Sequence, residues 1–378
     1  MKNLELVFFD AGGGHRSAAN ALCEVVRQQQ RPWNMQMMNL QELLDELDVF
    51  RQVSGIRLQD VYNLILQRGW TLGSARLLPF MHGIIRVYHR QQVKLLENYW
   101  RTRKPDMVVS VIPNFNRAIF QAMQRALPGV PMVTILTDMA DYPPHFWIER
   151  QPQYFICGTQ KAYEQALAMG HTKNRVFRTS GMILNPRYYE PVSVDRERDR
   201  EALGLNPGLP TLMMMFGGEG SLKMLEITRL LNESDLQLQL IAVCGKNQRL
   251  RCEMNALPRR IPMHVEGFTT EVPRLMRLSD AFIGKPGPGS ISEAVALGLP
   301  VIVESNLWTL PQERYNAEWV RRHEVGLVVR SFRKICTAVD QMLQPETFAR
   351  FRRNAESVQN RAVFEIPDIL NRILERHT

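Results

Sequence analysis

Two glycine-rich stretches hold the residues of this sequence that are best suited to bind a phosphate. One of them, Gly284-Lys285-Pro286-Gly287-Pro288-Gly289-Ser290, follows the apolar run Ala281–Ile283 and precedes apolar residues at helical spacing. Glycine lets the backbone approach a ligand closely, and a helix N-terminus offers free N–H groups and a positive dipole end. Glu293, one turn inside that helix, can accept hydrogen bonds from two adjacent ribose hydroxyls. A tight turn that binds nothing is the alternative for a single stretch of this kind.

The second stretch lies near the start of the chain. The apolar run Leu4–Phe9 predicts a buried strand, and Asp10-Ala11-Gly12-Gly13-Gly14-His15-Arg16-Ser17 follows it directly. Apolar residues at helical spacing come next, beginning at Ala18. The two strand, turn and helix sites are about 270 residues apart. We therefore expect two α/β domains that face one another across a cleft.

Short apolar runs alternate with helical stretches along most of the chain, which predicts parallel, doubly wound sheets with ligands at the carboxyl ends of their strands. The later strands expected in the N-terminal half are Met107–Ile112, Met132–Leu136, Tyr154–Cys157 and Val176–Thr179. Those expected in the C-terminal half are Leu212–Phe216, Leu238–Val243, Ala281–Ile283, Val301–Glu304 and Gly326–Val329. Ser180–Pro191 predicts the linker between the two halves.

The composition is that of a globular protein with room for two cores, since 45% of its 378 residues are hydrophobic. The sequence has neither a secretory apolar segment nor an apolar run long enough to span a bilayer. Its five cysteines are scattered without metal-ligand spacing, which favours reduced structural thiols. The formal net charge of +9 predicts an acidic partner, such as phosphates, an anionic membrane surface or nucleic acid.

The excess positive charge is concentrated in one stretch. Residues 51–104 contain ten basic residues against two acidic ones, together with several aromatic residues such as Trp70. Arg86, Arg90 and Lys94 recur every four residues and so lie on one face of a predicted helix. A basic, amphipathic segment with aromatic side chains suits the surface of an anionic membrane. A helix that packs on the core and exposes a solvated basic face is the alternative.

Several groups of residues, in collinear order, resemble those of the monogalactosyldiacylglycerol synthases and their bacterial relatives. The wider group includes the transferase that adds N-acetylglucosamine to lipid-linked peptidoglycan precursors. The matching residues are Asp10–Arg16, Thr137-Asp138, Asn185-Pro186, Phe216–Gly220, Gly267-Phe268, Gly284–Ala294 and Gln312-Glu313 with Asn316. The resemblance implies a GT-B fold of two Rossmann-like domains. It also implies an inverting transfer from a UDP-sugar to a lipid hydroxyl, without a catalytic metal or other cofactor.

The resemblance assigns the nucleotide-sugar to the C-terminal domain. The turns Gly217-Gly218-Glu219-Gly220-Ser221 and Gly287-Pro288-Gly289-Ser290, with Lys285 beside the second, would hold the diphosphate through backbone N–H groups. By similarity Phe268 meets the uracil ring and Glu293 binds the ribose. The sugar hydroxyls would be bound by Gln312 and Glu313, because a side-chain amide and a carboxylate supply both donors and acceptors. Asn316 belongs to the same nucleotide-sugar site.

Inversion requires a base that removes the proton of the acceptor hydroxyl, and the turn after the first strand offers candidates. His15 has a suitable pKa range for this role. A histidine that only helps to bind phosphate or acceptor is the alternative. Asp10 would orient His15 or act as the base itself, while Gly13 and Gly14 would contact the acceptor.

Two stretches depart from the family pattern. Pro113–Asn116 stands where the plant enzymes carry a His-Pro pair, and Trp308–Pro311 stands where a glycine is more usual. Both lie where the acceptor and the sugar would be bound. The identity of the sugar and of the acceptor therefore stays open.

We expect residues 1–181 to form an acceptor-binding, membrane-associating domain, residues 182–360 the nucleotide-sugar domain, and residues 361–378 a helix that crosses back to the first domain. The expected partners are a UDP-sugar, a lipid acceptor of diacylglycerol type and an anionic membrane, but no nucleic acid. The protein would be cytoplasmic and peripheral on the inner face of the cytoplasmic membrane, through Arg86, Arg90, Lys94 and Trp70.

Other functions fit part of these observations. The same transfer to a polyprenyl-linked or soluble acceptor would use the same donor site. A non-catalytic basic protein that binds lipid or nucleic acid would explain the charge but not the polar residues of the C-terminal half. An epimerase with the same fold would not explain the basic, aromatic stretch.

Overall fold

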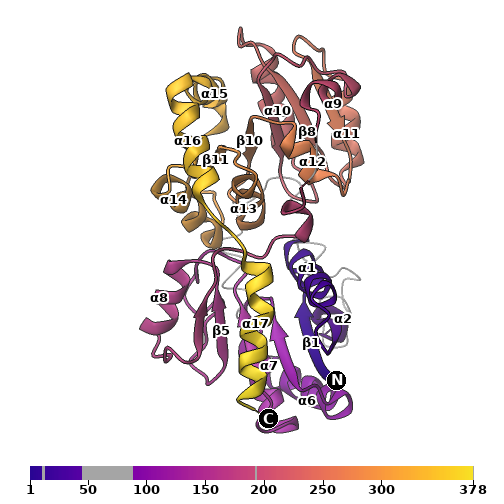
Figure 1. Cartoon of the computed structure of the whole chain (residues 1–378), viewed down its shortest axis with the longest axis vertical. Coiled ribbons are helices and arrows are strands. Elements are labelled where there is room, and N and C mark those ends of the chain that lie inside the picture. The colour runs from indigo at the N-terminus through magenta and orange to yellow at the C-terminus, as the bar shows by residue number, and fades with distance from the viewer. Residues whose placement is uncertain (11–12, 45–87, 192–193, 378) are drawn as a thin grey trace. The chain divides into compact units, whose positions relative to one another are not determined.

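The computed structural model describes residues 1–10, 13–44, 88–191 and 194–377. Contacts group these residues into two compact units, each built on one six-stranded parallel sheet (Figure 1). Among the described residues, the first unit comprises those up to Pro186 and those from Asn360 onward, whereas the second comprises Arg187–Gln359. The boundaries expected from the sequence, after residues 181 and 360, differ from these by a few residues.

The first sheet has the strand order β2-β1-β3-β4-β5-β6, and every neighbouring pair is parallel. Its strands are β1 (Lys2–Phe8), β2 (Trp33–Asn39), β3 (Met107–Ser110), β4 (Met132–Ile135), β5 (Tyr154–Cys157) and β6 (Val176–Arg178). The sequence pattern did not predict β2. This edge strand pairs only with β1, and because only Trp33 and Met38 of its residues are buried, it lacks the apolar run of a central strand.

The helices of the first unit are α1 (Gly14–Gln28), α2 (Leu40–Leu44), α6 (His89–Arg103), α7 (Asn116–Ala126), α8 (Gln160–Ala168) and α17 (Ala362–Glu375). Helices α2, α6 and α7 bury their apolar faces with β1 and β3 in one core cluster that includes Trp100. Helix α1 also buries one apolar face, since its buried residues, among them Ala18, Leu22 and Val26, recur at helical spacing.

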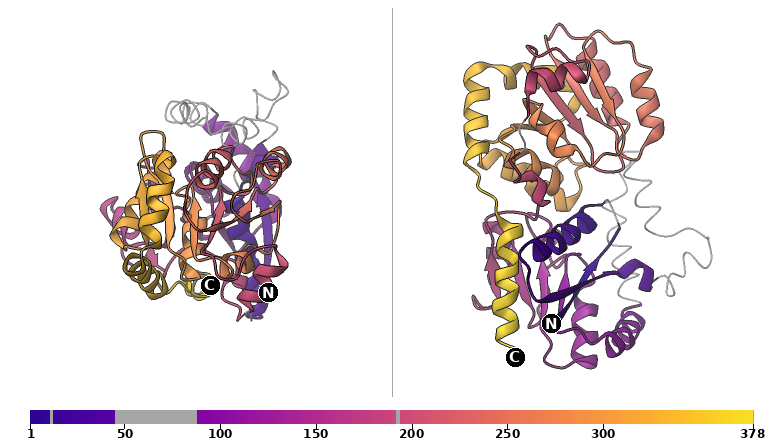
Figure 2. Two further views of the ribbon diagram at one scale, coloured as in Figure 1. Left: turned by 90° about the horizontal axis from the view of Figure 1, so that it is seen from above. Right: turned by 45° about the vertical axis from the view of Figure 1, so that its right-hand side comes forward.

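The last helix of the chain belongs to the first unit. Helix α17 packs beside α1, as Figures 1 and 2 show. Gln29 donates a hydrogen bond to the carbonyl of Phe364, and Glu365 accepts hydrogen bonds from the backbone and hydroxyl of Ser180. Asn360 donates to the carbonyl of Met182 at 2.9 Å. The C-terminal segment thereby covers the first sheet.

The second sheet has the order β12-β11-β10-β7-β8-β9 and is also parallel throughout. Its strands are β7 (Thr211–Met215), β8 (Gln239–Val243), β9 (Met263–Glu266), β10 (Ala281–Gly284), β11 (Val301–Glu304) and β12 (Gly326–Val329). Its α-helices are α9 (Arg196–Ala202), α10 (Lys223–Asn232), α11 (Gln248–Asn255), α12 (Val272–Arg277), α13 (Pro288–Ala296), α14 (Arg314–Arg322), α15 (Ile335–Leu343) and α16 (Pro345–Ser357). Three 3-10 turns, η3 (Pro186–Tyr188), η4 (Pro311–Glu313) and η5 (Phe332–Lys334), complete the described elements after β6.

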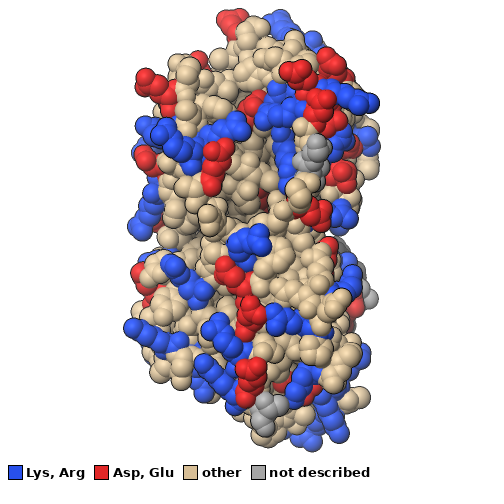
Figure 3. Space-filling view, viewed as in Figure 1, with Lys and Arg blue, Asp and Glu red and all other residues tan. Residues whose placement is uncertain are grey.

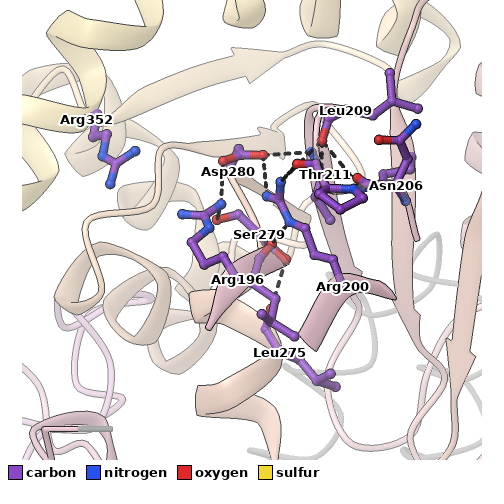
Figure 4. A network of polar contacts seen from close by, with 12 residues as sticks. Arg196, Arg200, Asn206, Leu209, Thr211, Leu275, Ser279, Asp280 and Arg352 are labelled. Atoms are coloured by element: carbon purple, nitrogen blue, oxygen red, sulfur yellow. Dashed lines mark hydrogen bonds and ion pairs between the residues drawn. The ribbon is translucent and has the colours of Figure 1, made fainter. Parts of the chain in front are cut away.

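An ion-pair network fastens α9 to the start of the second sheet (Figure 4). Asp280, just before β10, accepts hydrogen bonds from Arg196 at 2.6 Å, from Arg200 at 2.8 Å and from the backbone of Thr211 at 2.8 Å. The guanidinium of Arg200 also donates to the carbonyls of Leu278 and Pro207, both at 2.9 Å. The Arg200 side chain is only 7% exposed, so water does little to stabilise its positive charge. The carboxylate of Asp280 provides the counter-charge.

Removal of Asp280 should destabilise the second unit. We expect Asp280→Ala to lower the free energy of unfolding by about 3 kcal/mol, because it leaves a buried guanidinium without a counter-charge. Chemical denaturation with urea measures the change. Glu253→Ala is the matched control, since Glu253 pairs with Arg249 on the surface and its loss should cost less than about 1 kcal/mol. Equal effects of the two substitutions would contradict a special role for Asp280.

Candidate active site

The first candidate site lies where the strand order of the first sheet reverses. The chain passes from β1 to β2 on one side of β1 and then places β3 on its other side. In doubly wound sheets, ligands bind at the carboxyl ends of the strands at such a reversal. Helix α1 begins at this point, and the residue before it, Gly13, has a φ of +79° that favours glycine. No side chain of the described residues caps the helix, so its first N–H groups are available to a ligand.

His15 is the second residue of α1 and is partly exposed. Its Nδ1 lies 3.1 Å from the hydroxyl oxygen of Thr137, which follows β4, and the ring also hydrogen-bonds to the backbone of Val111, which follows β3. Burial lowers the pKa of His15 to about 4. The imidazole is therefore neutral at pH 7, which is the form that can accept a proton.

The side chains around His15 explain why it is held in place. Trp147 is fully buried, and its ring centroid lies 6.0 Å from that of the imidazole. The indole N–H of Trp147 donates to Asp138 at 2.8 Å, and its backbone N–H donates to Asp141 at 2.6 Å. Thr137 and Asp138, adjacent in sequence, thus position the histidine and its aromatic neighbour. Thr137 and Asp138 were among the residues that match the family, but the sequence did not indicate their role.

Asp10 and the turn glycines take other positions. The carboxylate of Asp10 forms an ion pair with Arg16, the third residue of α1. The guanidinium of Arg16 also lies over the ring of Phe8, 5.3 Å from its centroid. The side chain that orients His15 in this structure is therefore Thr137, where the sequence suggested Asp10. Gly14 is the first residue of α1, beside His15. The roles of Asp10 and His15 as a base, and of Gly13 and Gly14 in acceptor binding, stay predictions.

The second candidate site lies at the reversal of the other sheet, between β7 and β10. The two glycine turns predicted to hold a diphosphate follow these adjacent strands, so the parallel sheet brings them to the same edge. In the first turn, Gly217 and Gly220 have φ values of +78° and +64°, and the N–H of Gly220 donates to the carbonyl of Gly217 at 3.2 Å. Ser221 accepts a hydrogen bond from the N–H of Met224 and so starts α10.

The second turn leads directly into α13. Gly287 precedes the helix, Pro288 is its first residue, and Gly289 and Ser290 follow in its first turn. No side chain caps this N-terminus. Proline is well suited to the first helical position because it lacks the N–H that would have no partner there. The N–H groups at this end, together with the helix dipole, form a site that favours an anion.

Glu293 lies inside α13 and is held by a tyrosine that the sequence did not single out. Its carboxyl group hydrogen-bonds to the hydroxyl of Tyr188, and burial raises its pKa to about 7, against an ordinary value of 4.5. Tyr188 itself is buried. A carboxyl group with a single fixed donor retains acceptor positions for the hydroxyls of a ligand.

The residues predicted to bind the sugar meet the second turn from another element. Glu313 in η4 forms an ion pair with Lys285, with 3.1 Å between Nζ and Oε1. Asn316 in α14 donates to the carbonyl of Pro286 at 2.8 Å. Gln312 Oε1 and Asn316 Oδ1 are buried and have no hydrogen-bond partner among the described residues. Buried acceptors without partners are unusual in native proteins, and ligand hydroxyls would satisfy them.

Phe268, predicted to meet the base, is 62% exposed, in contrast to the buried rings of the core. Lys246 lies over its ring, with Nζ 5.7 Å from the centroid, and the same ammonium lies 3.7 Å from Glu219 in the first glycine turn. Lys246 follows β8 and thereby links two residues that were predicted separately. Its position in the sequence carried no signal of this role.

The basic stretch is described only in part. Arg86 and Trp70 lie outside the described residues. Arg90 and Lys94 are exposed on α6, whose residues Val93 and Leu96 are buried. They line a shallow pocket with other polar side chains of α6 and α7, namely Glu97, Asn98, Arg101 and Arg125. Elsewhere, on the face shown in Figure 3, basic and acidic side chains are interspersed.

Comparisons with known proteins agree with this arrangement. Residues 214–373 match the family model for the glycosyltransferase family 28 C-terminal domain. The chain is 26% identical to probable monogalactosyldiacylglycerol synthase 2, chloroplastic, of Oryza sativa subsp. japonica, over 99% of this chain and 81% of the relative. The crystal structure of Acinetobacter baumannii MurG has a TM-score of 0.63 at 13% identity, and the match covers 98% of this chain and 100% of MurG.

The chain is a glycosyltransferase with the GT-B fold. A further structure of the same fold is UDP-GlcNAc 2-epimerase from Neisseria meningitidis, bound to UDP-GlcNAc, with a TM-score of 0.63 at 14% identity over 99% of this chain and 100% of the epimerase. The resemblance read from the sequence motifs is confirmed over nearly the full length of this glycosyltransferase. Within its described residues, no helix combines the length and apolar character needed to cross a membrane.

The raised pKa of Glu293 predicts a stability effect that depends on pH. Because the pKa is about 7 in the folded protein and 4.5 for the ordinary group, ionisation of Glu293 costs stability progressively as the pH rises from 4.5 to 7. Glu293→Gln cannot ionise, and we therefore expect it to melt at a higher temperature than the unchanged protein at pH 8.5. This advantage should shrink at pH 5, as measured by calorimetry.

Tyr188→Phe is the control for this experiment. It removes the hydrogen bond that stabilises ionised Glu293, so it should lower the melting temperature at pH 8.5 more than at pH 5. If the difference between Glu293→Gln and the unchanged protein were the same at both pH values, Glu293 would not titrate in this range.

Proposed function

We propose that this glycosyltransferase transfers a hexose from a UDP-sugar to the hydroxyl of a diacylglycerol-type lipid, with inversion at the anomeric carbon. The observation that carries the proposal is the edge of the second sheet. There two glycine turns follow adjacent strands, and α13, which carries Glu293, begins at the second of them. Asn316 hydrogen-bonds to the backbone of that turn, and buried oxygens of Gln312 and Asn316 have no partner among the described residues. The glycine turns would match a diphosphate, Glu293 a ribose, and Gln312 and Asn316 a sugar ring.

Three lines of support point to this donor and acceptor. The backbone N–H groups of the glycine turns suit a diphosphate, and the N-terminus of α13 favours its negative charge. The Neisseria epimerase of the same fold binds UDP-GlcNAc, and the rice relative is named for the synthesis of monogalactosyldiacylglycerol. The stretch Trp308–Pro311 differs from the family pattern, so the sugar is left as an outcome of the experiment.

The first unit is proposed to supply the base and the attachment to the membrane. His15 would take the proton of the acceptor hydroxyl while the sugar leaves the diphosphate. The exposed cations Arg90 and Lys94, with Arg101 and Arg125 nearby, would bind phosphate headgroups on the inner face of the cytoplasmic membrane. Such attachment brings the enzyme to a lipid acceptor that does not leave the bilayer.

A transfer assay tests the proposal directly. The full-length protein is incubated with labelled UDP-glucose, UDP-galactose or UDP-N-acetylglucosamine and vesicles that contain diacylglycerol, and the lipid product is identified by mass spectrometry. We expect one UDP-sugar to yield a glycosyl-diacylglycerol, with activity that survives EDTA. Transfer only to a polyprenyl phosphate or a soluble alcohol would replace the acceptor. Absence of both UDP binding and transfer would contradict the whole proposal.

The same assay tests the membrane role. Activity should be higher on anionic than on neutral vesicles and should fall at high salt, because screening weakens the attraction of exposed charges. The double variant Arg90→Gln and Lys94→Gln should lose most of this preference and retain activity on a detergent-solubilised acceptor. Equal activity of variant and unchanged protein on anionic vesicles would assign this face to solvent.

The role of His15 as base predicts a loss of turnover without a loss of donor binding. We expect His15→Ala to lower kcat by at least about a hundredfold, the scale of general-base catalysis. The affinity for UDP should stay within about twofold, because the proposed donor groups belong to the other unit. Thr137→Val serves as a positioning control and should give a smaller loss, since the imidazole remains. If turnover survives in His15→Ala, Asp10 becomes the better candidate.

A further inference from the structure

We propose that the loop after β11, residues 305–310, binds the surface of an anionic bilayer, and that Leu307 and Trp308 are the side chains that enter it. This contact is separate from the cations of α6 and gives the second unit a membrane contact of its own. It goes beyond the proposed function, which attaches the protein through the first unit. It rests on that function only for the expectation that the acceptor is a membrane lipid.

The large apolar side chains that stay exposed in the described part of the second unit are confined to one edge of its sheet. They are Leu222, Phe268, Leu307 and Trp308, and each lies in a segment that follows the carboxyl end of a strand. Leu307 is 87% exposed and Trp308 is 49% exposed. A single exposed apolar residue needs no explanation, but an adjacent pair at the edge where ligands bind indicates a contact with another molecule.

The backbone of the loop is fastened by hydrogen bonds. Oδ1 of Asn306 accepts from the backbone N–H of Trp308 at 2.8 Å, and the N–H of Asn306 donates to the hydroxyl of Thr309 at 2.9 Å. The guanidinium of Arg314 donates to the carbonyls of Leu307 and Thr309, at 3.3 and 3.2 Å. These bonds satisfy backbone groups that would otherwise need water. They thereby lower the cost of moving the loop from water into contact with lipid.

The charge beside the loop is complementary to an anionic surface. The side-chain amide of Asn306 donates to the carbonyl of Arg330 at 3.1 Å, which joins the loop to the segment that follows β12. Arg314 and Arg330 are both exposed, and neither residues 305–312 nor residues 330–334 include an acidic residue. Arginine beside exposed leucine and tryptophan suits a bilayer interface, where the guanidinium meets phosphate and the apolar side chains enter between the headgroups.

The two acidic residues that border the loop are both engaged within the second unit. Glu304, at the end of β11, accepts a hydrogen bond from the backbone N–H of Phe332 at 2.8 Å. Glu313 is 8% exposed and forms the ion pair with Lys285. Their negative charges are therefore balanced by protein groups, and the exposed cations near Leu307 and Trp308 determine the charge that a bilayer meets.

The position of the loop indicates what the contact does for the transfer. The loop leads into η4, which carries Gln312 and Glu313, and the N–H of Glu313 donates to the carbonyl of Leu310 at 2.8 Å. A bilayer bound at Leu307 and Trp308 is thus a few residues from the proposed sugar site. Because a lipid acceptor presents its hydroxyl at the bilayer surface, the contact brings this hydroxyl toward the donor sugar.

Vesicle binding tests the contact in the absence of donor and acceptor. The full-length protein is sedimented with vesicles of phosphatidylcholine and phosphatidylglycerol at low and at high salt. Salt screens charges but does not remove apolar burial. The double variant Leu307→Ser and Trp308→Ser should therefore lower the partition coefficient at high salt by about tenfold or more, the scale for losing buried apolar side chains. Arg90→Gln with Lys94→Gln should instead reduce mainly the binding at low salt.

Leu222→Ser is the matched control. Leu222 is 37% exposed at the same edge of the sheet, beside the first glycine turn, and its replacement should leave the partition coefficient unchanged. An equal loss in Leu222→Ser and in the double variant would overturn the specific role of the loop. Unchanged binding of the double variant at high salt would overturn the contact itself.

Fluorescence quenching locates the indole ring directly. Trp308→Phe keeps an apolar side chain, so it should still bind the vesicles. Phosphatidylcholine that is brominated in its acyl chains quenches only indole rings that enter the bilayer. We therefore expect the quenched fraction of the total fluorescence to be smaller in Trp308→Phe than in the unchanged protein. The same quenched fraction in both proteins would place Trp308 outside the bilayer and contradict the proposal.

Kinetics separate a bilayer contact from a contact with the donor sugar. In the transfer assay, the double variant should raise the apparent KM for diacylglycerol in vesicles, while its affinity for the UDP-sugar stays within about twofold. Weaker binding of the UDP-sugar with unchanged vesicle binding would assign Leu307 and Trp308 to the sugar and overturn the proposal. Failure of the unchanged protein to transfer any sugar would contradict the proposed function, whereas the vesicle experiments would still decide the role of the loop.

Discussion

The turns after β7 and β8 pack backbone against backbone, and the rest of the candidate site in the second unit depends on this contact. A Cβ on Gly245 would lie 2.2 Å from the carbonyl oxygen of Gly218, and one on Gly220 would lie 2.4 Å from that of Cys244. Both glycines also have positive φ, which other residues adopt only at a cost. Any side chain here would push the turns apart and displace Lys246 and the start of α10, which follow them directly.

Charge is the second constraint on this site. Glu293 and Glu313 are carboxyl groups drawn out of water, and burial of such groups is costly without partners. Each has one donor from outside its own helix, Tyr188 for Glu293 and Lys285 for Glu313. These arrangements leave acceptor positions open, and the raised pKa of Glu293 shows that the folded protein is not optimised for its own stability at this point. Sites that sacrifice stability in this way are commonly those that bind a ligand.

The first unit follows a similar principle with fewer charges. Burial lowers the pKa of His15, and Thr137 and the backbone of Val111 hold its orientation. Trp147 donates hydrogen bonds to Asp138 and Asp141, which hold its ring in place beside the imidazole. A side chain held from several strands loses little conformational freedom when a substrate arrives, so its geometry is available before the reaction begins.

Local patterns in the sequence were enough to determine most strands and the glycine turns. The predicted β5, β11 and β12 match the structure at both ends, because each is a short, largely apolar run bounded by turn residues, even though β12 lies at the edge of its sheet. The edge strand β2 escaped detection, since only two of its residues are buried and pairing to β1 decides its conformation. The resemblance of the motifs to a known family then indicated the GT-B fold.

Only the tertiary structure decided which side chains meet. His15 and Thr137 are 122 residues apart in sequence, and neither Tyr188 with Glu293 nor Lys285 with Glu313 shows a spacing that announces a contact. For His15 with Thr137 and for Lys285 with Glu313, the physical reason is the parallel sheet, which aligns the carboxyl ends of its strands along one edge whatever the length of chain between them. Periodicity therefore reports where each strand ends, and the order of strands in the sheet determines which of those ends become neighbours.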